Sequence, residues 1–134
     1  MRKANDTLVF RWFKEVWNDS RKEVIDELLK DDVTAHGLGP EGKTHGLDAF
    51  KQFYDDFRSQ FKDVHVIVED VISEDDIETA RCSVKAIHIP SGKEVNFTGM
   101  SMAKIEDGKI AESWNSFDFL TMYQQAGFAL APQL

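Results

Sequence analysis

Helical spacing of apolar residues dominates the first half of this chain, and strand-like patterns dominate the second half. Residues 47–61 have the clearest period, with aromatic side chains at i, i+3, i+4, i+7 and i+11. These side chains are Phe50, Phe53, Tyr54, Phe57 and Phe61. Strand-like runs then cover residues 64–72, 77–89, 93–105 and 109–117, with turn sequences between them. Helices that precede a series of antiparallel strands predict an α+β fold, in which the helices pack on one face of a sheet.

Three further helices and a short strand complete the predicted elements. Residues 6–18 form a helix that is apolar over a broad arc, so other elements should pack on more than one of its sides. Ser20 and Glu23 form a capping-box pattern that opens a helix reaching residue 29, where Asp31 and Asp32 follow. Residues 33–36 form a brief strand, and the last helix covers 118–126. Because the four strand runs are long and consecutive, we expect the sheet to curl into a cone that holds a cavity.

Size and charge narrow the range of functions. The chain has 134 residues, which is the size of one domain, 1–134, with a single core. Its net charge of −8 disfavours nucleic acid and anionic membranes as partners, because both attract basic surfaces. Cys82 is the only cysteine, and no apolar run approaches the length of a membrane span. Since the N-terminal residues also lack a signal-peptide pattern, we expect a cytoplasmic protein.

The segment 99–118 carries the strongest candidate for chemistry. It is typical of a hairpin that turns at Asp107-Gly108 and delivers Trp114 and Asp118 to the far end of the sheet. A carboxylate beside a large aromatic side chain suits an acid–base centre in an apolar pocket. The same aspartate also suits the N-cap of the last helix. Asp118 is therefore either a pocket acid or base, or a helix cap, or both.

The histidines predict no metal site, since none has the His-x-His or i, i+4 spacing of zinc ligands. His36 follows an apolar strand and precedes a glycine, so we expect it to point inward, as a core histidine or as a polar pocket group. Residues 37–42 match G-x-G-x-x-G literally. They do not open a helix within a βαβ unit, so we expect no dinucleotide cofactor.

Five further side chains are candidates for the walls of a pocket: Trp17, Phe53, Phe57, Met100 and Trp114. Periodicity locates the apolar face of each element but does not decide whether that face is filled by core or encloses a cavity. Met100 and Met102 share one strand face, with Phe97 on the other. Apolar residues on both faces suggest that one face packs on the helices and that the other pairs with a second subunit.

Several segments together resemble the SnoaL-like polyketide cyclases, a family of the nuclear transport factor two-like superfamily. The resemblance covers nearly the whole chain. It is carried by Trp12-Phe13-x-x-Val16-Trp17-Asn18, Ile25-Asp-Glu-Leu28, Val33-x-x-His36-Gly37, Phe50 to Phe57, Gly99-Met-Ser101, Ile105-Glu-Asp-Gly-Lys-Ile110 and Trp114-x-x-x-Asp118.

This resemblance implies a cone-shaped α+β fold that is dimeric through its sheet and has a deep pocket at the wide end. It also implies ring closure by intramolecular aldol condensation without metal or cofactor, with Asp118 as the acid–base residue. Our leading hypothesis adds His36 as a polar partner of Asp118. The expected ligand is a small, largely apolar or aromatic carbonyl compound. The alternatives are a non-catalytic dimer that binds such a molecule, or a structural dimer whose cavity is filled by its own side chains.

Overall fold

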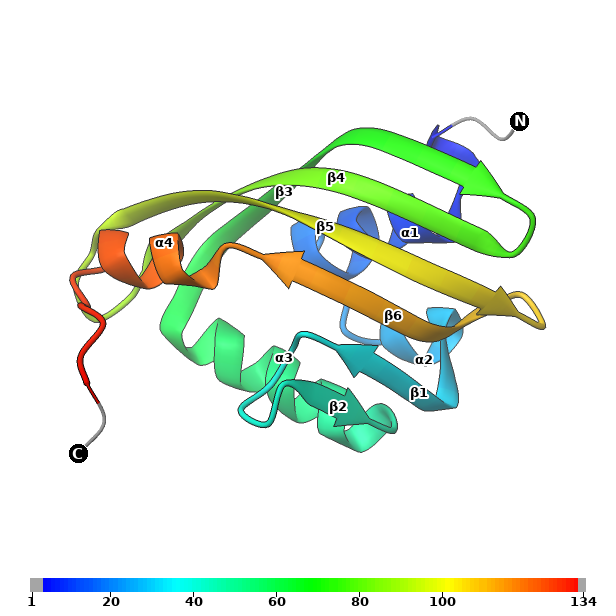
Figure 1. Ribbon diagram of the computed structural model, residues 1–134, viewed down its shortest axis with the longest axis horizontal. Helices are drawn as coiled ribbons and strands as arrows, with labels where there is room; N and C mark the ends of the chain where they lie inside the picture. The colour runs from blue at the N-terminus through cyan, green and yellow to red at the C-terminus, as the bar shows by residue number, and fades with distance from the viewer. Residues whose placement is uncertain (1–3, 133–134) are drawn as a thin grey trace.

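The computed structural model describes residues 4–132, which form one curved sheet with the N-terminal and central helices on one face (Figure 1). The expected α+β fold is therefore confirmed. The helices are η1 (Ala4–Asp6), α1 (Leu8–Arg11), η2 (Trp12–Asn18), α2 (Val24–Leu28), α3 (Leu47–Gln60) and α4 (Phe119–Gln125). The strands are β1 (Leu29–His36), β2 (Lys43–His45), β3 (Phe61–Glu74), β4 (Ile77–His88), β5 (Glu94–Glu106) and β6 (Lys109–Phe117).

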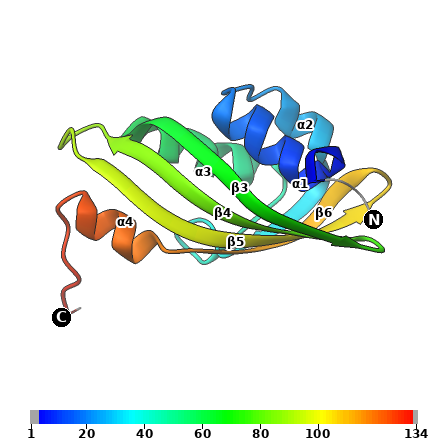
Figure 2. The ribbon, with the colours of Figure 1, turned by 90° about the horizontal axis from the view of Figure 1, so that it is seen from above.

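The sheet has the strand order β2-β1-β6-β5-β4-β3. The strands from β3 to β6 are antiparallel neighbours, β1 runs parallel to β6, and β2 forms a short antiparallel edge beside β1. Register shifts interrupt the β3–β4 and β5–β6 ladders, and such irregularities increase the local twist of long strands. Figure 2 shows the resulting curvature, with α1, α2 and α3 on the same side of the sheet and α4 at its far end.

The first predicted helix differs from an ordinary α-helix. One α-helical turn, α1, continues into the π-helix η2, in which the Asp19 N–H donates to the Lys14 carbonyl, five residues earlier, at 2.8 Å. The wider π-turn brings residues five apart onto one side. Trp12 and Trp17, which have this spacing, consequently face the same space. A broad apolar arc in the sequence does not distinguish the period of an α-helix from that of a π-helix.

Two local predictions were wrong. The capping box at Ser20 and Glu23 does not form: Ser20 has a left-handed φ of 57°, and the helix α2 begins only at Val24. The segment 29–36, of which only the last four residues were predicted as strand, is all β1, because pairing with β6 begins at Leu29. Pairing with β6 overrides local propensity in β1, and the Ser20 hydroxyl accepts from Arg58 of α3 at 3.0 Å instead of capping α2.

The core lies between the helices and the concave face of the sheet. From α3, Phe50 and Tyr54 are buried, and the Tyr54 hydroxyl donates to the Val16 carbonyl at 2.9 Å. Strand β5 alternates strictly, so that Val95, Phe97, Ser101 and Ala103 point to the core. The predicted stripe of α3 and the alternation of β5 thus fall where the sequence indicated, and between them lies the cavity described next.

Candidate functional site

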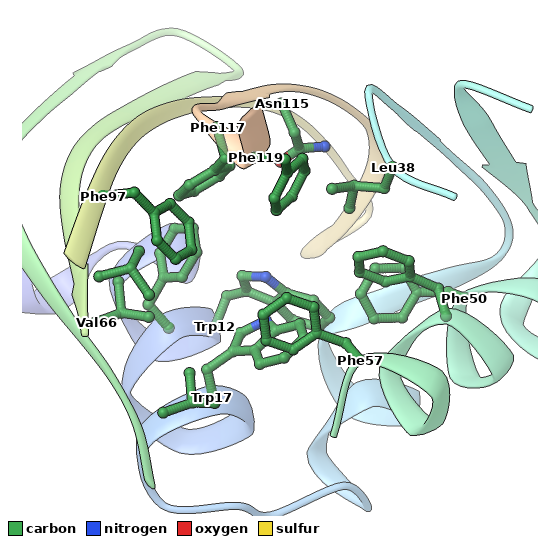
Figure 3. A pocket seen from close by; sticks show the side chains of 14 residues that line it. Trp12, Trp17, Leu38, Phe50, Phe57, Val66, Phe97, Asn115, Phe117 and Phe119 are labelled. Carbon is green, nitrogen blue, oxygen red and sulfur yellow. The ribbon is translucent and has the colours of Figure 1, made fainter. Parts of the chain in front are cut away.

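A cavity of about 60 Å³ lies between η2, α3 and the concave face of the sheet, and we call it the aromatic chamber (Figure 3). Nine of its fourteen lining residues are aromatic. The lining consists of Trp12, Phe13, Trp17, Leu38, Phe50, Phe53, Phe57, Val64, Val66, Val84, Phe97, Asn115, Phe117 and Phe119. Small-molecule sites are mostly apolar with a few placed polar groups, and this lining has that composition.

Strand β6 contributes one polar and one aromatic side chain to the chamber, because alternate residues of a strand point to the same face. Asn115 and Phe117 line the chamber, whereas Trp114, between Asn115 and Ser113, points to the opposite face. Phe117 pairs with Gly99 of β5, and a Cβ atom at Gly99 would lie 2.2 Å from the Phe117 ring. Glycine at position 99 therefore gives the Phe117 ring the room in which it lies.

The inner end of the chamber is polar. The Ser101 hydroxyl donates to Asn115 Oδ1 at 2.7 Å, and Asn115 Nδ2 donates to Ser113 Oγ and to the His36 carbonyl, each at 3.0 Å. Ser101, Ser113 and Asn115 also line a smaller cavity of about 20 Å³ that shares Trp12, Leu38 and Phe50 with the chamber. A ligand in the chamber would meet this network at its inner end.

A wider cleft of about 690 Å³ lies outside the chamber, and we call it the outer cleft. Phe53, Phe57 and Phe119 line both spaces, so the cleft leads to the chamber past three phenylalanine rings. The other lining residues of the outer cleft are Gly37, Gly39, Pro40, Glu41, Lys43, Thr44, His45, Ala49, Gln52, Asp56, Gln60, Phe61, Met122 and Tyr123. In contrast to the chamber, the outer cleft carries titratable side chains.

Neither the chamber nor the smaller cavity is lined by a titratable side chain of the described residues. Within residues 4–132, no three histidine, cysteine or acidic side chains are grouped so that they could hold a metal ion. Burial raises the pKa of Cys82 to about 12, so this thiol stays protonated at neutral pH and is a poor nucleophile. The site as described is suited to binding an apolar molecule through shape and a few hydrogen bonds.

Asp118 lies outside both cavities and is exposed. Its carboxylate caps α4, accepting from the Thr121 N–H at 3.0 Å and from the Thr121 hydroxyl at 2.7 Å. These hydrogen bonds lower the pKa of Asp118 below its ordinary value of 3.8. Of the two interpretations that the sequence left open, this geometry is the helix cap, and the expected pocket position of Asp118 is wrong.

His36 also lies on the other side of the sheet from the chamber. Its Nε2 is 2.6 Å from Glu112 Oε2, and its ring stacks on Trp114 with centroids 5.7 Å apart. Met100 lies on this convex face too and is 50 % exposed. The expectation that His36, Trp114 and Met100 face the pocket is therefore wrong. Alternate residues of a strand point to opposite faces, and the helices cover the face that carries Asn115 and Phe117, not the face that carries Trp114.

The remaining predicted wall residues, Trp17, Phe53 and Phe57, do line the chamber. Their role in binding a ligand stays a prediction. The polar residue that the sequence analysis missed is Asn115. The available signal was its spacing: Asn115 is two residues from Phe117 and so shares its face, whereas Asp118 falls after the end of the strand.

No helix among residues 4–132 is long and apolar enough to span a membrane. A family model described as SnoaL-like polyketide cyclase matches residues 7–126. No curated protein matches the chain significantly.

Solved structures share the fold across nearly the whole chain. IdmH of Streptomyces antibioticus, a candidate polyketide cyclase, is 23 % identical, with 94 % of this chain and 100 % of that chain covered and a TM-score of 0.79. A candidate polyketide cyclase of Bacillus cereus ATCC 10987 is 29 % identical over 90 % of this chain and 78 % of that one, also with a TM-score of 0.79. A protein of Catenulispora acidiphila with a ketosteroid isomerase-like fold is 13 % identical, with 93 % and 97 % covered and a TM-score of 0.80. At identities below 25 %, such likeness shows the fold alone.

Proposed function

Because the chain belongs to the SnoaL-like polyketide cyclase family, we propose that it acts on a small, largely apolar carbonyl compound by ring closure or isomerisation, without a cofactor. The observation that supports this function is the aromatic chamber with the Asn115 amide at its inner end. Its volume of about 60 Å³ is small, so a larger ligand extends past Phe53, Phe57 and Phe119 into the outer cleft.

The chamber contributes to such a reaction by confinement. Its aromatic walls exclude water and hold a flexible ligand folded, so that the reacting carbon atoms stay close together. Hydrogen bonds at the inner end stabilise the oxygen on which charge develops when an α-proton leaves. Titratable groups that exchange this proton stand in the outer cleft, Asp56 and Tyr123 among them. Asp118 and His36 have no part in this chemistry, because neither side chain lines the chamber or the cleft.

A binding experiment tests the site. Acetophenone is a single-ring aromatic ketone that would extend from the chamber toward the outer cleft, and its binding can be followed through the fluorescence of Trp12 and Trp17, which line the chamber. Val84→Phe places a ring in the chamber and should weaken binding at least roughly tenfold, since overpacking removes the space for a ligand. Ile67→Phe adds the same ring at a half-exposed position of β3 and should leave binding unchanged. If Val84→Phe and Ile67→Phe bound acetophenone equally well, the chamber would not be the binding site.

The second candidate function is binding without catalysis, which is favoured because none of the residues 4–132 that line the chamber or the smaller cavity has a titratable side chain. Exchange of the α-protons of acetophenone for deuterium, followed by NMR, separates the two. A cyclase or isomerase of this type should accelerate the exchange, because loss of an α-proton begins both reactions, and Val84→Phe should abolish the acceleration. Tight binding of acetophenone without faster exchange would favour binding without catalysis.

The convex face of the sheet supports a further proposal, that two copies of the chain pair through it. Met100, Met102 and Trp114 lie together there on neighbouring strands and are 39–50 % exposed. Exposed apolar side chains that cluster in this way are typical of an interaction surface. A symmetric pair would bury the same residues on both copies.

We also propose a cytoplasmic location. The single cysteine, Cys82, is buried and unpaired, as is usual in a reducing compartment. Fractionation of cells that produce the chain from its own gene would test this location, and recovery outside the cytoplasm would contradict it.

A further inference from the structure

The amide of Asn115 has a fixed orientation at the inner end of the chamber. The atom that lies 3.0 Å from the His36 carbonyl oxygen must be a donor, because a carbonyl oxygen only accepts hydrogen bonds. This atom is therefore Nδ2, and Oδ1 is directed to the Ser101 hydroxyl at 2.7 Å. A flipped amide would bring Oδ1 against the His36 carbonyl, which two acceptors do not tolerate.

The fixed orientation allows the remaining donors and acceptors to be counted. Both Nδ2 hydrogens are used, one by the His36 carbonyl and one by Ser113 Oγ. Asn115 Oδ1 accepts one hydrogen bond from Ser101, which leaves it one lone pair. Ser113 Oγ accepts from Asn115, and its own hydrogen has no acceptor among residues 4–132. Among these three side chains the Ser113 hydrogen is the donor that is left, whereas Asn115 Oδ1 and the two serine oxygens all keep lone pairs that can accept.

We propose that Asn115 and Ser113 recognise one hydroxyl group of the ligand, in the form of an enol or a phenol. A hydroxyl both donates and accepts, so it satisfies the Asn115 lone pair and the Ser113 hydrogen together. The adjoining cavity of about 20 Å³, which both residues line, has room for a single oxygen atom. This assignment rests on the proposed function, because it presumes that the aromatic chamber, together with the adjoining outer cleft, holds the ring to which the hydroxyl is attached.

The count of free donors and acceptors also predicts how well other ligand groups would fit beside Asn115 and Ser113. A carbonyl oxygen accepts from Ser113 but gives Asn115 nothing, and a methyl group leaves both polar atoms unpaired. For a ketone that can enolise, the site consequently favours the enol, which is the nucleophilic form in ring closure. Binding of this tautomer supplies part of the activation in a chamber that, among residues 4–132, has no titratable side chain in its lining.

Three single-ring probes distinguish these groups: phenol, benzaldehyde and toluene. Their dissociation constants are measured by quenching of tryptophan fluorescence in the unmodified protein, in Ser113→Ala and in Ser101→Ala. Ser113→Ala removes the free donor, so its affinity for phenol should fall roughly fivefold relative to its affinity for toluene. The affinity of Ser113→Ala for benzaldehyde should fall by a similar factor relative to its affinity for toluene. Ser101→Ala is the matched control, because the Ser101 hydrogen is already used by Asn115, and it should keep the preference for phenol over toluene.

The outcomes separate this assignment from the proposed function. If none of the three probes binds the unmodified protein, the chamber is not a site for aromatic ligands and both ideas fail. If all three bind and Ser113→Ala leaves the ratio of phenol to toluene affinity unchanged, only the hydroxyl assignment is overturned. Should Ser113→Ala fail to fold, Ser113→Cys, whose thiol is a weak donor, should show the same selective loss of phenol.

Discussion

At the scale of single residues, neighbouring positions near the end of β6 have opposite roles. Trp114 lies on the convex face against His36, Asn115 carries the hydrogen bonds of the chamber, and Asp118 caps the following helix. Each role follows from geometry rather than residue type, since a carboxylate and a tryptophan are also typical of an active site. If Asp118 acts as a helix cap and not as a catalytic residue, its removal should change stability and not ligand binding.

Asp118→Ala should destabilise the fold without changing ligand affinity. The variant loses both hydrogen bonds from Thr121, and alanine is a poor N-cap. Thermal unfolding should therefore occur at a lower temperature, whereas acetophenone binding should be unchanged. Asp118→Asn, which also caps helices well, is the control and should unfold close to the unmodified protein. Loss of ligand binding in Asp118→Asn would contradict the cap interpretation.

The same residue predicts a dependence on pH. Its folded-state pKa is lowered, so the ionised carboxylate stabilises the fold above the unfolded pKa of about 3.8. This contribution is lost as the pH falls through the lower folded pKa. The unmodified protein should consequently be destabilised by acid more than Asp118→Asn, as measured by the urea midpoint at pH 6 and at pH 3. If the urea midpoints of the unmodified protein and of Asp118→Asn fell equally between pH 6 and pH 3, the lowered pKa of Asp118 would be contradicted.

At the scale of elements, the π-helix η2 is the part of the chamber that local pattern predicts least. It is fixed to the strands through the preceding turn, α1, and through its own last residue, Asn18. The Val9 N–H, just before η2, donates to the buried Glu78 of β4 at 2.9 Å. At the other end, the Asn18 amide donates to the Val66 carbonyl at 2.8 Å and accepts from the Val66 N–H at 2.6 Å. Arg58 of α3 also donates to the Trp17 carbonyl. These contacts hold the tryptophans of η2 toward the chamber.

Asn18→Ala should cost about 2 kcal/mol of unfolding free energy, because two partly buried backbone groups of Val66 lose their partner. The exposed pair of Lys14 and Asp19 offers a control on the same helix, and Lys14→Ala should cost under about 1 kcal/mol. Urea unfolding of both variants measures the difference. The Asn18 variant should also show altered tryptophan fluorescence, because Trp17 is next to the lost contact. Equal stabilities would show that Asn18 does not hold η2.

At the scale of the whole molecule, the sheet has two apolar faces with different surroundings. The concave face carries the helices and the chamber, and the convex face is open in the isolated chain, with Met100 and Met102 exposed (Figure 2). The aromatic chamber and the outer cleft together form the path from solvent to Asn115. The fold thus separates a candidate ligand site on one face from a candidate subunit contact on the other.

Met102→Glu should weaken pairing through the convex face, because it places a charge directly opposite Trp114 in the neighbouring strand. The expected result in sedimentation equilibrium is a dimer for the unmodified chain and a monomer for the variant at the same concentration. Ile72→Glu, at an exposed position of β3, is the control and should stay dimeric if the contact is centred on β5 and β6. A monomeric unmodified chain would contradict the proposed pairing.

The sequence by itself determined which residues share a face within each element. The stripe of Phe50 and Tyr54 on α3 and the alternation of Phe97 and Met100 on β5 are consequences of the helical and strand periods, so they could be predicted without the fold. The order of helices and strands likewise predicted the α+β class. These properties depend on neighbours a few residues apart, and the sequence contains that information.

Only the tertiary structure decided which strand face is covered and where the cavity lies. A period of two makes Trp114 and Asn115 equivalent candidates until η2 and α3, some 100 and 60 residues earlier in the chain, pack on one face. The folded chain also shows that η2 is a π-helix and that β6 ends at Phe117, one residue before Asp118. Contacts between distant segments are not encoded in local pattern, and for this reason Asn115 was identified as a chamber residue only in the folded chain.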